Sequence, residues 1–137
     1  MVPSLDRIRI ERRAIAPHET LVLAMSFPPS LNNLFPGKEH RYESKEYRAW
    51  QLDNKATLLS GDRRRVPGPV HILLEYEDAG RKDLDNLQKA VFDLLVDCNV
   101  IDGDGRAVVR AFTAKWVSDV QGVRITISPI RQERVAA

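Results

Sequence analysis

An apolar periodicity directly behind two aspartates is the feature of this sequence that most limits its fold. Leucine and valine recur at positions 84, 87, 91 and 94 or 95, which is the spacing of a helix that buries one face. Asp83 stands at the N-cap position, and Asp85 would fall in the first turn, where the helix dipole keeps carboxylates ionised. The pattern predicts a central helix that opens with two charged oxygen donors, a ligand set suited to a hard cation.

Four further acids follow in the same stretch, and they differ in whether they can join this pair. On a continuous helix Asp93 and Asp97 would lie roughly 12 and 18 Å beyond Asp85, too far to share one metal ion. Asp102 and Asp104 come after the helix, and a chain that returns antiparallel to it could bring one of them back to its start. The residues alone allow either of these two acids to be the third ligand.

Each of these features also has a plain structural interpretation. Aspartates at the start of a helix commonly cap it, Asp85 and Lys89 have the spacing of a solvated pair, and Asp102-Gly103-Asp104 is typical of a tight turn. A calcium-binding EF-hand loop beginning at Asp102 is excluded, because Arg106 would take its fifth position and Thr113 the place of its bidentate glutamate. A functional interpretation therefore depends on the features taken together.

Taken together, the motif residues closely resemble the RusA family of Holliday-junction resolvases. The similarity is carried without a gap by residues 82–89 and 100–104, and more weakly by residues 28–32 after the first predicted strand. It implies an active site of Asp83, Asp85, Lys89 and Asp104, with the three aspartates as ligands of Mg²⁺, which Mn²⁺ can replace. Gly103 stands where the family usually has another aspartate.

The same resemblance implies an enzyme, an endonuclease that resolves four-way DNA junctions by paired symmetric nicks in DNA recombination and repair, acting as a homodimer. Two alternatives remain open. One is a nuclease of the same fold that acts on other branched or flapped DNA, and the other is a non-catalytic DNA-binding module that keeps the acids only as caps. Cleavage in Mg²⁺ would distinguish them.

The charge distribution is compatible with a nucleic-acid partner. Residues 81–104 hold three basic and six acidic side chains, which leaves 18 basic and 13 acidic ones in the remainder. An acidic centre in a basic surround suits a metal-dependent enzyme on a polyanion, although a mixed solvated surface would look the same. The predicted contacts to the DNA backbone are the densest basic run and the two residues before the acids: Arg63, Arg64, Arg65, Arg81 and Lys82.

Local patterns predict the other elements. Strands are expected at 21–27, 70–77, 107–117 and 122–128, the last two as a hairpin, and a helix capped by Ser44 is expected to run to about residue 59. The order predicts one α+β domain over residues 1–137, a mixed sheet of about four strands covered by two helices. Residues 1–18 are expected to form an irregular or partly ordered arm, and residues 129–137 a frayed tail.

Three single residues and the absence of a membrane span complete these expectations. The lone cysteine, Cys98, excludes an internal disulfide and is predicted to be inert core in a cytoplasmic protein. Trp50 is predicted to lie in the core rather than to stack on bases, and His71 to be structural. Neither an apolar run of membrane-spanning length nor a secretory signal is present, so no membrane partner is expected.

Overall fold

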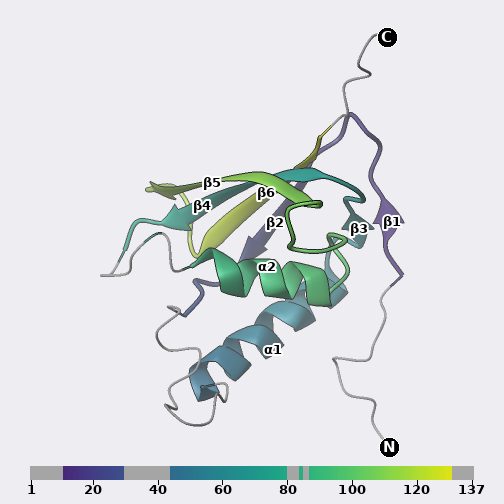
Figure 1. Cartoon of the computed structure of the whole chain (residues 1–137). Helices are drawn as coiled ribbons and strands as arrows, with labels where there is room; N and C mark the ends of the chain where they lie inside the picture. The colour runs from purple at the N-terminus through teal and green to yellow at the C-terminus, as the bar shows by residue number, and fades with distance from the viewer. Residues whose placement is uncertain (1–10, 30–43, 80–83, 85–86, 131–137) are drawn as a thin grey trace, which may run out of the picture.

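The computed structural model describes residues 11–29, 44–79, 84 and 87–130. A four-stranded sheet has the strand order β2-β6-β4-β5, and β1 pairs separately with β3. Figure 1 shows both helices on the same side of the four-stranded sheet. In chain order the elements are β1 Arg13–Ala14, β2 Leu21–Met25, α1 Lys45–Ser60, β3 Arg64–Arg65, β4 Val70–Glu77, α2 Gln88–Asp97, β5 Val109–Val117 and β6 Val123–Pro129. The predicted α+β architecture, with a mixed sheet of four strands and two helices, is confirmed.

The hydrophobic core fills the space between the sheet and the helices. On β4 every second side chain is fully buried, and α2 turns a continuous apolar face towards the core. The buried side chains of these two elements are Val70, Ile72, Leu74, Tyr76, Ala90, Val91, Phe92, Leu94 and Leu95. Since burial of one large apolar side chain contributes about 1.5–3 kcal/mol, this contact is the main force that fixes α2 on the sheet.

Helix α1 begins as its sequence predicts. The Ser44 hydroxyl accepts a hydrogen bond from the Tyr47 amide at 3.1 Å, which satisfies one of the free N–H groups of the first turn. Trp50 is buried, and its indole N–H donates to the Ser26 carbonyl at 2.9 Å, which confirms its predicted place in the core. The Asn54 carboxamide accepts from the Ser26 amide at 3.0 Å. The bonds that Trp50 and Asn54 make to Ser26 join α1 to the end of β2.

The predicted hairpin between the last two strands is wrong. β5 is parallel to β4, β6 is antiparallel to β4, and β4 lies between them. The local sequence does not distinguish the two topologies. A connection of residues 118–122 can close a hairpin, and it is also long enough to cross the end of one intervening strand. Two strand spacings are about 10 Å, and five residues can span roughly 16 Å.

Gly122 makes this crossing possible where it enters β6. Its φ angle is +73°, a conformation that glycine adopts without steric cost. A Cβ atom added there would lie 2.3 Å from the carbonyl oxygen of Met25. The end of β2 therefore packs directly against the backbone of the crossing segment.

The start of α2 also differs from the prediction. The helix begins at Gln88 with Leu87 at its N-cap position, whereas the sequence predicts Asp83 as the N-cap. Leu84 lies in a 3-10 turn. The apolar spacing correctly identifies the buried face of α2. Asp83 and Asp85, which the sequence places at the start of this helix, lie outside the described residues.

Part of the predicted N-terminal arm belongs to the fold, because Arg12 closes the ends of both helices. Its guanidinium donates to the carbonyl oxygens of Leu58 and Asp62, each at 3.0 Å, and of Cys98 at 2.6 Å. Leu58 lies in the last turn of α1, and Cys98 is the C-cap of α2. One cation thus satisfies carbonyls at the negative ends of two helix dipoles.

The remaining expectations concern the thiol, the tail and a membrane span. Cys98 is a free thiol in the core, as predicted, and burial raises its pKa. The predicted frayed tail does not begin at residue 129, since β6 continues to Pro129 and the Ile130 amide donates to the Pro69 carbonyl at 2.9 Å. Residues 131–137 lie outside the described part. No described helix is long and apolar enough to cross a membrane.

Candidate active site

The residues predicted for the site divide into two groups. Arg81, Lys82, Asp83 and Asp85 lie outside the described residues. Lys89 and Asp104 are described, one near the start of α2 and the other in the connection from α2 to β5. The geometry of the site is therefore built from these two residues and their neighbours.

Lys89 forms an ion pair with an acid one turn along the same helix. Its Nζ atom is 3.7 Å from Oδ2 of Asp93, an i,i+4 pair on the face of α2 that does not enter the core. The lysine side chain is 56% exposed and the Asp93 side chain 34% exposed. The ammonium group of Lys89 is thus accessible to a ligand while it is paired with the partly buried carboxylate of Asp93.

Asp104 approaches the same carboxylate from the connection to β5. Burial is the main cause that raises the pKa of Asp93, and the Lys89 ammonium acts in the opposite direction. The Asp104 carboxyl raises the pKa of Asp93 again, both by charge repulsion and through a side-chain hydrogen bond. The structure therefore brings Lys89, Asp93 and Asp104 together as a cluster with two acids and one base.

Asp102 lies in a different environment. It pairs with the guanidinium of Arg65 and accepts a hydrogen bond from the Gly68 amide at 2.8 Å. These bonds join Asp102 to the end of β3 and to the segment between β3 and β4. The two acids that sequence alone could not separate have different partners, and only Asp104 interacts with Asp93.

The comparison with known proteins bears on the same residues. The family model described as endodeoxyribonuclease RusA matches residues 27–128, which include every residue of this cluster. This chain belongs to the RusA family. The crossover junction endodeoxyribonuclease rusA of Enterobacteria phage 82 is 29% identical over 119 residues, covering 83% of this chain and 98% of the phage protein.

The metal-ligating part of the RusA motif is only partly described. Within the described ranges, no group of three or more His, Cys, Asp and Glu side chains could hold a metal ion. Of the three aspartates predicted to hold the metal, Asp104 is described, and its carboxyl is a hard oxygen donor that fits a divalent cation. Asp83 and Asp85, the other two predicted ligands, lie outside the described residues.

Two residues of the basic run Arg63–Arg65 belong to a paired strand, which a loop that only aids solubility would not need. Arg64 and Arg65 form β3, which pairs in parallel with β1. Arg64 contacts two acids, Asp62 at 2.7 Å and Glu19 at 3.2 Å, and Arg65 is paired with Asp102. The side-chain hydrogen bond that Arg64 donates is the main cause that lowers the pKa of Asp62.

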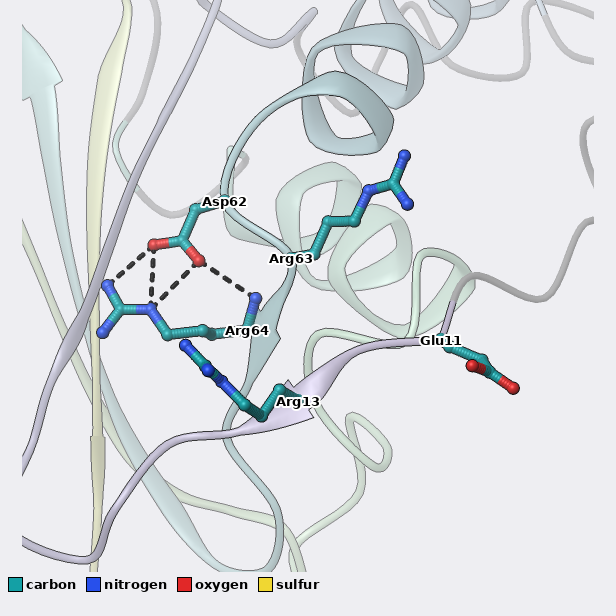
Figure 2. Close-up of a pocket in the computed structure, with 5 residues that line it drawn as sticks. All are labelled: Glu11, Arg13, Asp62, Arg63 and Arg64. Carbon is teal, nitrogen blue, oxygen red and sulfur yellow. Dashed lines mark hydrogen bonds and ion pairs between the residues drawn. The ribbon is translucent and has the colours of Figure 1, made fainter.

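Arg63 differs from its two neighbours. Its guanidinium donates only to a backbone oxygen, that of Leu59 at 3.2 Å, and contacts no carboxylate in the described part of the chain. Figure 2 shows Arg63 pointing away from the Asp62–Arg64 pair, while all three line a pocket with Glu11 and Arg13. Of the three predicted DNA contacts in this run, Arg63 has the cationic group most available to a phosphate.

Two residues that matter to this RusA-family structure were missed by sequence reasoning. Asp93 was considered only as a metal ligand shared with Asp85, and its pairing with Lys89 was not predicted. Arg12 gave no signal, because its partners are backbone carbonyls. The spacing of Lys89 and Asp93 was the one available clue to the first, as an i,i+4 pair on the exposed face.

Proposed function

We propose that this chain is a Mg²⁺-dependent endonuclease that resolves four-way DNA junctions by paired symmetric nicks, in DNA recombination and repair. The observation that carries the proposal is the cluster of Lys89, Asp93 and Asp104, since two residues of the RusA motif meet there. The name of the phage 82 relative, a crossover junction endodeoxyribonuclease, supports a branched substrate. Mn²⁺ is expected to replace Mg²⁺.

The proposed roles follow from the chemistry of each side chain. Asp83, Asp85 and Asp104 would hold the metal ion, which when bound supplies Lewis-acid catalysis to phosphodiester hydrolysis. Lys89 would offset the negative charge that develops on the phosphate. Arg81, Lys82 and the basic run would fix the position of the DNA backbone.

A homodimer is proposed from the symmetry of the substrate. A four-way junction has an approximate two-fold axis, and symmetric cuts in two strands require two active sites related by the same axis. One protomer contributes one cluster around Lys89. Two protomers bound across the junction would therefore place one site on each of the two strands that are cut.

The test is to incubate the protein with a synthetic mobile junction and Mg²⁺ and to map the nicks on all four strands. We expect paired nicks at symmetric positions on two opposite strands. Single cuts on flapped or three-way substrates, with the four-way junction intact, would instead identify a nuclease for other branched DNA. Retardation of the junction without any cut would identify a binding module and refute the endonuclease proposal.

Arg63 is expected to contribute one phosphate contact to junction binding. Because the guanidinium of Arg63 pairs with no described carboxylate, Arg63→Ala should lower the magnitude of the slope of log K against log salt concentration by about 1. For comparison, Arg65→Ala should lower the slope less, because the guanidinium of Arg65 is already paired with Asp102. Binding is measured by fluorescence anisotropy at several salt concentrations. Equal slopes for wild type and Arg63→Ala would remove Arg63 from the DNA interface.

A further inference from the structure

Asp93 interacts with Lys89 and Asp104, the two residues of the predicted RusA active site that the structure describes. Its Oδ2 atom lies 3.7 Å from the Lys89 ammonium, and its carboxyl interacts with that of Asp104. It projects from the face of α2 opposite the buried residues, so its place is not required by packing in the core. Asp93 thus interacts with both Lys89 and Asp104.

A simple surface ion pair does not account for this arrangement. An exposed i,i+4 pair contributes about 0.3–0.5 kcal/mol to stability, and its value falls when a second acid is placed beside the first. Here the chain brings Asp104 to the acid of the pair and partly buries that acid, with Asp97 also near enough to repel it. The repulsion and the partial burial of Asp93 both reduce the stability that its ion pair with Lys89 provides. Stability alone therefore does not explain why Asp93 is placed here.

We propose that Asp93 is a positioning residue, whose carboxylate holds the Lys89 ammonium beside Asp104 so that the lysine faces the scissile phosphate from a fixed place. This inference rests on the proposed endonuclease function. Lysine has a flexible four-carbon stem, and without a partner its ammonium samples many positions. Because small displacements of a charged group cost rate, one carboxylate on the same helix can determine how effective Lys89 is.

The first experiment compares Asp93→Asn with wild type in single-turnover cleavage at saturating protein. Loss of a group that orients an active-site residue typically costs about 10- to 100-fold in activity, so we expect a fall of that size in the rate of cleavage. Junction affinity should stay within about twofold, because no charge that contacts DNA is removed. The matched control is Asp97→Asn, an exposed acid one turn further along α2, which should leave the rate unchanged.

A double-mutant cycle shows whether Asp93 acts through Lys89. If it does, Asp93→Asn should have little further effect in a Lys89→Ala background, whereas independent contributions would multiply. Thermal unfolding of each variant identifies losses caused by misfolding, and Asp93→Glu, which keeps the charge, should retain most activity. The inference is overturned if Asp93→Asn cleaves at the wild-type rate, if its effect is equal in both backgrounds, or if added Mg²⁺ restores the full rate, which would make Asp93 a metal ligand. Failure of the wild-type protein to cut junctions would refute the function itself, independently of these variants.

Discussion

Asp104→Asn is expected to abolish junction cleavage, whereas Asp102→Asn keeps most of the activity. Asp104 lies beside Asp93, next to the pair formed with Lys89, while Asp102 is occupied by Arg65 and the Gly68 amide. Loss of a metal ligand should cost more than the roughly 10- to 100-fold typical of an outer-sphere partner. Asp83→Asn and Asp85→Asn should behave like Asp104→Asn. Cleavage is measured under saturating Mg²⁺.

Binding and stability controls make this comparison decisive. Junction binding by Asp104→Asn should be unchanged or tighter, because the substitution removes a negative charge that repels phosphate. Asp102→Asn should cost about 0.5–1 kcal/mol of stability, since its ion pair with Arg65 is partly exposed to solvent. If Asp102→Asn were inactive and Asp104→Asn active, the third metal ligand would be Asp102, and the motif would be aligned wrongly by two residues.

Arg12→Ala is expected to cause the largest loss of stability that the fold predicts for a residue outside the apolar core. The substitution leaves three carbonyl oxygens without their donor, two at the end of α1 and one at the end of α2. Leaving a buried acceptor without its hydrogen bond typically costs about 1–3 kcal/mol, so we expect a total loss of about 3 kcal/mol or more. Urea denaturation followed by circular dichroism should show this as a lower midpoint with an unchanged slope.

Arg13→Ala provides the matched control for Arg12. The two residues are adjacent, but Arg12 is 9% exposed whereas Arg13 is exposed. Arg13→Ala should therefore change stability by less than about 0.5 kcal/mol. Arg12→Lys should recover only part of the loss, because an ammonium cannot reproduce the planar fork of a guanidinium. Equal stability of the Arg12 and Arg13 variants would show that the helix ends are satisfied by other donors.

The sequence predicts those parts of the structure that depend on local periodicity. Alternation along residues 70–77 and the helical spacing behind Asp83 identified the central strand and the buried face of α2, and Ser44 marked the start of α1. The pairing of β5 could not be derived in this way. Its partner is β4, some forty residues earlier, and a short connection is typical of a hairpin even when another strand lies between.

The roles of Lys89 and Asp104 come from the resemblance to the RusA motif and remain predictions. The structure adds that both residues interact with Asp93. Asp93 was weighed only as a metal ligand shared with Asp85, so its pairing with Lys89 was not predicted. Polar residues before an apolar periodicity can belong either to the first turn or to the preceding loop, and only the three-dimensional structure decides between them.

β6 joins strands from both halves of the sequence. β2 and β4 do not bond to each other but each to β6, and Leu21 pairs with Ile127, about a hundred residues away. During synthesis the helices and the β4–β5 pair can form earlier, but the complete sheet must wait for residues 123–129. Until then β2 has no partner in the sheet and one edge of β4 remains open. These two segments are therefore where a nascent chain would be most prone to aggregation and most dependent on chaperones.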